Sequence, residues 1–144
     1  MSIVCVDASL PLQFLLGDTW SDASAVIWRE WTEAGLEIAA PPLFRAEVTS
    51  VVRERVYRNE FSRAEGDAAL SISLGWPVTI SAESTNLQRR AFAFASQYNR
   101  PKAYDAQYLA LAEILGCELW TADERLYNTV GKDLPWVKWI GAST

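Results

Sequence analysis

Short apolar runs alternate along the chain with longer segments of helical periodicity. The apolar runs are three or four residues long, as expected for short buried strands. They are residues 3–6, 36–39, 78–80, 118–121 and 137–140. Between them, apolar residues recur at spacings of three and four, as they do along one face of an α-helix. The predicted helices are residues 18–34, 41–59, 62–74, 84–99 and 102–115.

Strands that alternate with helices predict an α/β fold, because a helical crossover brings each new strand back parallel to the previous one. We therefore expect a three-layer α/β/α domain, similar to a Rossmann fold, with a parallel sheet of four or five strands. No linker, repeat or low-complexity stretch divides the chain, so residues 1–144 are predicted to form a single domain.

The first predicted helix has an apolar face that we expect to be buried. Val26, Ile27 and Trp31 define this face. Trp28 lies off it and is therefore a candidate contact for a partner chain.

Composition and charge narrow the class of protein. Half of the 144 residues are apolar and seven are tryptophan, which predicts a folded core. No apolar run approaches the roughly 20 residues of a membrane span, and the first residues do not resemble a secretory signal. We therefore expect a cytoplasmic protein without a membrane partner.

The net charge of −5 argues against general binding of nucleic acid through its phosphates. The basic residues are nevertheless concentrated, since nine of 13 fall between Arg45 and Lys102. They could form a local basic rim for a short RNA segment, or an ordinary solvated surface with ion pairs. The sequence leaves both interpretations open.

Histidine is absent, and the chain has only two cysteines. The first fact excludes Ser-His-Asp hydrolases, His-dependent nucleases and His-containing zinc sites. Cys5 and Cys117 lie in or beside apolar strands, so we expect buried, reduced thiols rather than a disulfide or a metal pair.

Four carboxylates stand beside core-forming segments, where an unpartnered charge is costly to bury. They are Asp7, Glu47, Asp105 and Asp123. Asp7 and Asp123 follow predicted strands, and the carboxyl ends of neighbouring parallel strands meet at one edge of a sheet. Asp105 and Glu47 each interrupt an apolar helix face. A hard divalent cation is the partner that best suits several carboxylates at once, which favours Mg²⁺, with Mn²⁺ as a substitute.

Each of these acids also has a purely structural explanation. Asp105 could complement the dipole of its helix, and Asp123 could be a turn residue. Asp7 could bind loop amides, and Glu47 could pair with an arginine. Four such coincidences are less expected than one shared site. If the acids do share a site, their mutual repulsion should raise the pKa of at least one of them without metal.

Three sequence segments and one helical glutamate carry a family resemblance. Val-Asp-Ala-Ser at residues 6–9 precedes Glu47. Tyr-Asp-Ala-Gln-Tyr-Leu-Ala-Leu-Ala-Glu follows at 104–113, and Thr-Ala-Asp-Glu-Arg-Leu at 121–126. In this order and spacing the chain resembles a PIN domain, and more narrowly the VapC-type toxin ribonucleases. The resemblance extends from Ile3 to about Trp139.

The resemblance implies a Mg²⁺-dependent endoribonuclease that acts as the toxin of a type II toxin–antitoxin pair. Asp7 and Asp105 would be the main metal ligands, with Glu47 and Asp123 completing the set. The metal would activate water to cut an RNA phosphodiester and leave 5′-phosphate and 3′-hydroxyl ends. The implied partners are RNA, a cognate antitoxin and a second copy of the chain.

Thr121 and Ser9 are supporting candidates for the same site. Thr121 could hydrogen-bond a carboxylate, whereas Ser9 is more simply explained as the cap of the helix after the first strand. Two other functions stay open: a PIN-like module that binds proteins without catalysis, and a PIN nuclease that processes RNA without an antitoxin.

Overall fold

The computed structural model describes residues 2–143, and these residues form five strands, seven α-helices and one short 3₁₀ helix. The strands are β1 (Ile3–Val6), β2 (Glu37–Ala40), β3 (Val78–Ile80), β4 (Leu119–Thr121) and β5 (Val137–Trp139). The α-helices are α1 (Ser9–Leu16), α2 (Ser21–Glu33), α3 (Phe44–Tyr57), α4 (Arg63–Leu74), α5 (Thr85–Gln97), α6 (Tyr104–Leu115) and α7 (Glu124–Val130). The 3₁₀ helix η1 (Ile140–Ser143) follows β5.

All five strands are parallel, in the order β3-β2-β1-β4-β5. The chain builds the sheet outward from β1 to β3, then returns to the other side of β1 for β4 and β5. The strand order therefore reverses between β1 and β4, which is where open α/β sheets place their ligands. This architecture confirms the predicted three-layer α/β fold.

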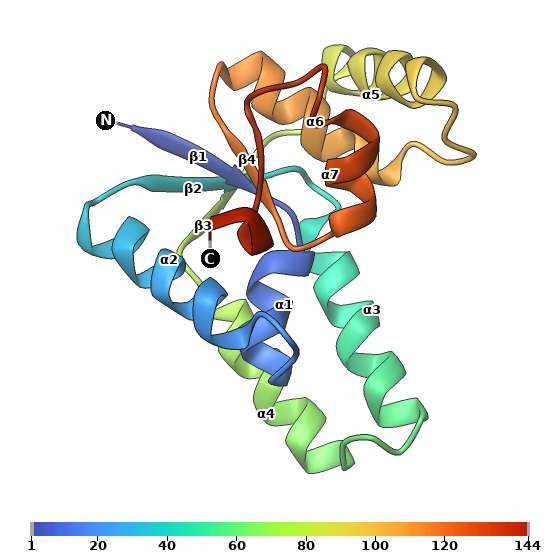
Figure 1. Ribbon diagram of the computed structural model, residues 1–144. Helices are drawn as coiled ribbons and strands as arrows, with labels where there is room; N and C mark the ends of the chain where they lie inside the picture. Colours follow the sequence, from blue (N-terminus) through green and yellow to red (C-terminus); the bar gives the residue numbers. More distant parts are fainter. Residues whose placement is uncertain (1, 144) are drawn as a thin grey trace.

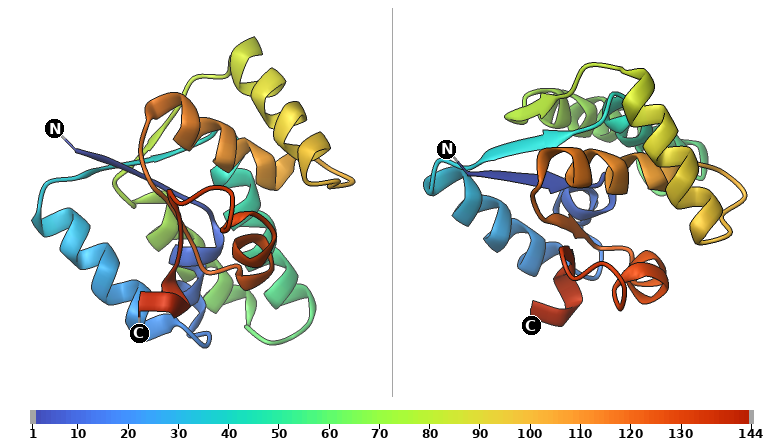
Figure 2. Two further views of the ribbon diagram at one scale, coloured as in Figure 1. Left: turned by 45° about the horizontal axis from the view of Figure 1, so that its top comes forward. Right: turned by 90° about the horizontal axis from the view of Figure 1, so that it is seen from above.

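Helices cover both faces of the sheet. Figure 1 shows α5 and α6 on one side and α1, α2 and α4 on the other. The further views in Figure 2 show α5 outside α6, which itself packs against β1. Helices α3 and α4 form an antiparallel pair that extends away from the sheet (Figure 1). Among the described residues, no helix is both long and apolar enough to cross a bilayer.

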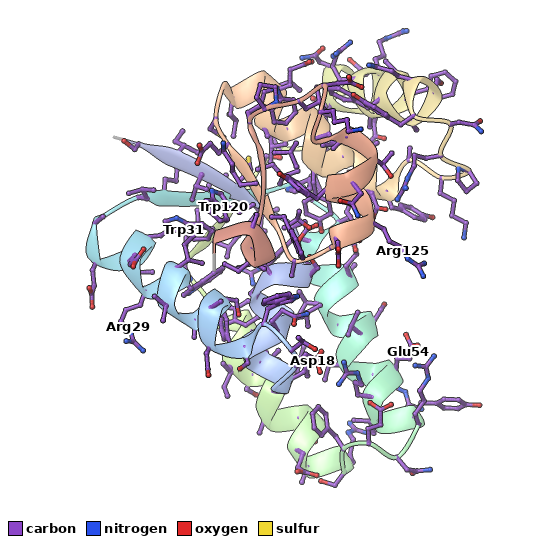
Figure 3. The ribbon with its side chains drawn as sticks, in the orientation of Figure 1. Asp18, Arg29, Trp31, Glu54, Trp120 and Arg125 are labelled. Carbon is purple, nitrogen blue, oxygen red and sulfur yellow. The ribbon has the colours of Figure 1, made fainter. Side chains whose placement is uncertain are left out.

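Aromatic side chains fill the layer between the sheet and α2. Trp31 of α2 meets Trp120 of β4 edge to face, with ring centroids 6.0 Å apart (Figure 3). Trp28 packs against Phe14 in the same way at 5.5 Å.

The predicted exposure of Trp28 was therefore wrong. Trp28 is 9% exposed, whereas Val26, which was expected to be buried, is 50% exposed. The buried stripe of α2 is rotated towards the two tryptophans, because large aromatic rings remove more apolar surface from water than a valine does.

No bounds were predicted for two short helices, α1 and α7, although the suggested cap at Ser9 implied a helix directly after the first strand. The α1 sequence Ser-Leu-Pro-Leu-Gln-Phe-Leu-Leu is apolar almost throughout, so it lacks the periodicity that marks a half-buried helix. Its proline lies in the first helical turn, where no intrahelical N–H bond is lost. Helix α7 has only seven residues, too few to show a period.

Candidate active site

The end of β1 and the end of β4 lie side by side. The register pairs Val6 with Trp120, so the next residue, Asp7, lies beside Thr121. The Asp7 amide donates to the Trp120 carbonyl at 3.2 Å, which extends the strand pairing by one residue. The Thr121 hydroxyl, completely buried, donates to Asp7 Oδ2 at 2.6 Å. Asp7 is thus held at the point where the strand order reverses.

Ser9 holds the other oxygen of the same carboxylate. Its hydroxyl donates to Asp7 Oδ1 at 2.5 Å and accepts the Ala122 amide at 3.0 Å. The N-cap of α1 is Ala8, and Ser9 is already the first helical residue. The interpretation of Ser9 as a helix cap was therefore wrong, because its hydroxyl is turned towards the strand ends.

Asp123 stands at the start of α7, beside this hydrogen-bonded group. Its Oδ1 accepts the Leu126 amide at 3.2 Å, so the carboxylate caps the helix. Its own amide donates to Thr121 Oγ1 at 2.9 Å. Thr121 consequently connects Asp7 and Asp123 through one hydroxyl. Asp123 is thus a helix cap rather than the suggested turn residue, and this structural role coexists with a position at the strand ends.

Glu47, in the first turn of α3, is partnered by a tyrosine. The Tyr108 hydroxyl donates to Glu47 Oε1 at 2.9 Å, and Tyr108 is only 2% exposed. Within residues 2–143, no arginine or lysine forms an ion pair with Glu47, so the suggested arginine partner is replaced by a phenol. Sequence reasoning did not assign Tyr108 a role. The signal was present, because a buried tyrosine one turn after Asp105 needs a partner for its hydroxyl.

Asp105 lies in the first turn of α6 and is partly exposed. Its Oδ2 forms an ion pair with Arg100 Nη2 at 2.8 Å. Arg100 lies in the loop that precedes α6, and it was counted among the basic residues without a specific role. One carboxylate of the group therefore already has a cationic partner within the chain.

The four acids influence one another electrostatically. Burial raises the pKa of Asp7 to about 7, against the hydrogen bonds from Ser9 and Thr121, and the charges of Asp123 and Asp105 raise it further. Burial also raises the pKa of Glu47, with the Tyr108 hydrogen bond opposing and Asp105 adding to the rise. The predicted upward pKa shift within the group is confirmed, although burial is a larger cause than repulsion.

The four acids are neighbours, but they do not form a complete set of metal ligands. Among the described residues, no three carboxylate or thiol groups are close enough to hold a metal ion as they stand. Their chemistry nevertheless fits a hard divalent cation, because every donor is a carboxylate or hydroxyl oxygen. Asp7 and Glu47 are also costly to ionise in the protein alone. A site that used three or more of these acids would therefore require some of their side chains to move.

Several of the nine concentrated basic residues form ion pairs at the surface rather than a basic rim. Four of them do so: Arg55 with Asp18, Arg58 with Glu54, Arg63 with Asp67 and Arg90 with Glu113. Figure 3 shows Asp18 pointing towards α3, which carries Arg55. The solvated-surface interpretation holds for these four arginines, whereas Arg100 reaches the acidic group.

Comparison with known proteins identifies the family. Residues 4–132 match the PIN domain. Over 127 residues the chain is 34% identical to VapC ribonuclease Mb0985 of Mycobacterium bovis and to ribonuclease VapC9 of Mycobacterium tuberculosis. Each alignment covers 88% of this chain and 91% of the relative. The chain therefore belongs to the PIN domain family, and VapC ribonucleases are among its relatives, as the resemblance in sequence predicted.

Solved structures share the fold at lower identity. VapC20 of Mycobacterium tuberculosis, described as a sarcin–ricin-loop-cleaving toxin, matches with a TM-score of 0.65 and 16% identity. The match covers 84% of this chain and 90% of VapC20. VapBC2 of Rickettsia felis, solved on a DNA fragment from its promoter, matches with a TM-score of 0.65 and 13% identity over 95% and 96% of the two chains.

The burial of Asp7 predicts a pH-dependent stability in the absence of metal. The folded protein binds the Asp7 proton more tightly than the unfolded chain, so the free energy of unfolding falls as pH rises from about 4 to about 7. The rise in pKa from 3.8 to about 7 corresponds to a loss on the order of 4 kcal/mol. Asp7→Asn should lack this loss and be the more stable protein at pH 8. Urea unfolding in EDTA between pH 4 and 8 measures the free energy of unfolding of both proteins. If the difference in this free energy stayed constant with pH, the prediction would be contradicted.

The Thr121 hydroxyl is predicted to stabilise the site as well as the fold. Thr121→Val keeps the side-chain shape but removes the hydroxyl that donates to Asp7 Oδ2 and accepts the Asp123 amide, while Ser9 still donates to Asp7 Oδ1. We expect a loss of about 1–3 kcal/mol at pH 8, where Asp7 is charged. Thr121→Ser, which keeps the hydroxyl, is the matched control. In urea unfolding, Thr121→Val should be less stable than Thr121→Ser. The reverse order would exclude this role for the hydroxyl.

Proposed function

We propose that this chain is a metal-dependent endoribonuclease and the toxin of a toxin–antitoxin pair. The observation that carries the proposal is the buried Asp7 carboxylate, oriented by two hydroxyls at the reversal of strand order. Curated relatives at 34% identity that are named VapC ribonucleases support it. No histidine or cysteine lies among the residues that we assign, so carboxylates must supply the chemistry.

Asp7 and Asp105 are the residues that would bind the divalent cation most directly, with Glu47 and Asp123 completing the set. Mg²⁺ is the expected ion, and Mn²⁺ a substitute, because all of these donors are oxygens. When bound, the ion would supply a Lewis acid for the phosphate and lower the pKa of a water molecule. The expected products carry 5′-phosphate and 3′-hydroxyl ends.

The surrounding residues prepare the acids for this task. Thr121 and Ser9 fix both oxygens of Asp7, so the carboxylate needs little reorganisation on binding. Tyr108 fixes one oxygen of Glu47. Arg100 balances the charge of Asp105 in the metal-free protein through Oδ2, and a cation bound by Asp105 would compete with this ion pair.

RNA must meet the site locally, because the protein as a whole is acidic. Arg125 is exposed in the first turn of α7, two residues after Asp123, and projects outward from that helix (Figure 3). An arginine in that position can bind a phosphate next to the scissile bond. Lys102, exposed in the loop before α6, is a second candidate.

An antitoxin is the protein partner that we expect. The support is the likeness of the fold to VapBC2 of Rickettsia felis and to a toxin–antitoxin complex from Klebsiella pneumoniae. A homodimer and a cytoplasmic location stay predictions from the family resemblance and from the sequence.

The proposal predicts that the purified protein cuts cellular RNA with Mg²⁺ or Mn²⁺ and is inactive in EDTA. Asp7→Asn should reduce cleavage by at least 100-fold, on the order of the effect of one essential group in a catalytic site. Asp67→Asn is the matched control, because Asp67 is exposed and forms a surface ion pair with Arg63. Sequencing of the new RNA ends would give the target and the end chemistry.

Three results would count against the proposal or against part of it. Equal cleavage by the wild type and Asp7→Asn would assign the activity to another site or to a contaminant. No cleavage by either protein, with metal binding intact, would favour the non-catalytic interaction module. A cutting enzyme whose expression does not arrest growth would favour RNA processing without an antitoxin.

A further inference from the structure

The two cysteines form a thiol pair across the junction of β1 and β4. Their sulfur atoms lie 3.5 Å apart, although the residues are separated by 112 positions in the sequence. Both are free cysteines. Cys5 belongs to β1, and Cys117 lies in the link between α6 and β4. The pair therefore bridges the two strands that lead to Asp7 and Asp123.

The two thiols differ in their access to solvent. Cys5 is 1% exposed, in the centre of the sheet. Cys117 is half-buried and lines a surface groove of about 790 Å³, together with Trp31, Leu36 and Trp136. A small oxidant in this groove can reach Cys117 and cannot reach Cys5.

The thiol that faces the groove is also the more easily ionised of the two. When Cys117 loses its proton, the Cys5 thiol can donate a hydrogen bond to the sulfur, which lowers the pKa of Cys117. The thiolate is the nucleophilic form of cysteine. Access and ionisation therefore select the same residue for the first reaction.

We propose that Cys5 and Cys117 are a peroxide-sensitive pair that closes to a reversible disulfide between β1 and β4. The Cys117 thiolate attacks one peroxide oxygen, the O–O bond breaks, and Cys117 becomes a sulfenic acid while the other oxygen leaves as water after taking a proton. The Cys5 sulfur then attacks the Cys117 sulfur as its proton passes to the departing oxygen, so the sulfur–sulfur bond forms and the second oxygen leaves as water. One peroxide is reduced and two thiols are oxidised.

The position of Cys117 allows the bond to close. A disulfide has a sulfur–sulfur distance of about 2.0 Å, so the two sulfurs must approach by roughly 1.5 Å. Cys5 is fixed in the central strand. Cys117 directly follows the left-handed Gly116, which ends α6 with a φ of 66°, and it precedes β4. The link outside regular structure can therefore supply the movement.

Oxidation of the purified wild type by hydrogen peroxide tests the proposal without reference to nuclease activity. The number of free thiols, measured after unfolding, should fall from two to none, and the monomer mass should decrease by two hydrogens. Dithiothreitol should restore both thiols. A proteolytic cut between residues 5 and 117 should leave the fragments joined until reductant is added.

Two single variants separate the roles of the cysteines. In Cys5→Ser, peroxide should leave a Cys117 sulfenic acid that a 1,3-diketone such as dimedone traps. In Cys117→Ser, Cys5 should stay a thiol and react with iodoacetamide only after unfolding. The wild-type result alone would overturn the proposal if peroxide gave disulfide-linked dimers, a sulfinic acid on Cys117 without an internal bond, or no reaction.

Discussion

The hydrogen bonds that Thr121 donates to Asp7 and that the Ala122 amide donates to Ser9 join the two halves of the protein at the reversal of strand order. One half is built on β1, β2 and β3, and the other on β4 and β5. The hydroxyls of Thr121 and Ser9 satisfy both oxygens of a buried carboxylate, which would otherwise be among the most costly groups in the core. Every other acid of the site is positioned with respect to this point. Asp123 is attached to it through Thr121, while α3 and α6 bring Glu47 and Asp105 towards it.

Hydrogen bonding does not fully compensate the burial of Asp7. The pKa of about 7 shows that the charged form remains unfavourable even with two hydroxyl donors. The burial of Asp7 thus lowers the stability of the metal-free protein at neutral pH. A cation bound at the same site would restore that stability. A purely structural aspartate would gain nothing from this arrangement. The Tyr108–Glu47 pair follows the same pattern, since the tyrosine hydroxyl orients a half-buried carboxylate without neutralising its charge.

The sequence predicted the sheet and the position of Asp7 at the strand ends because those features depend on local patterns. Apolar runs marked all five strands, and an acid after a strand marked the edge where Asp7 lies. The orientation of α2 was not predictable from periodicity, because the packing of Trp28 against Phe14 decides it. The roles of Ser9 and Arg100 depend on where other elements place Ala122 and Asp105, and these are contacts that only the folded chain creates.

The central claim is that the four acids act as one cation site organised around Asp7. Calorimetric titration of the metal-free protein with Mn²⁺ tests this claim most directly. The variants Asp7→Asn and Asp67→Asn are titrated in parallel. We expect binding to the wild type and to Asp67→Asn, and an affinity at least about tenfold weaker for Asp7→Asn. Equal affinity in all three proteins would contradict the claim.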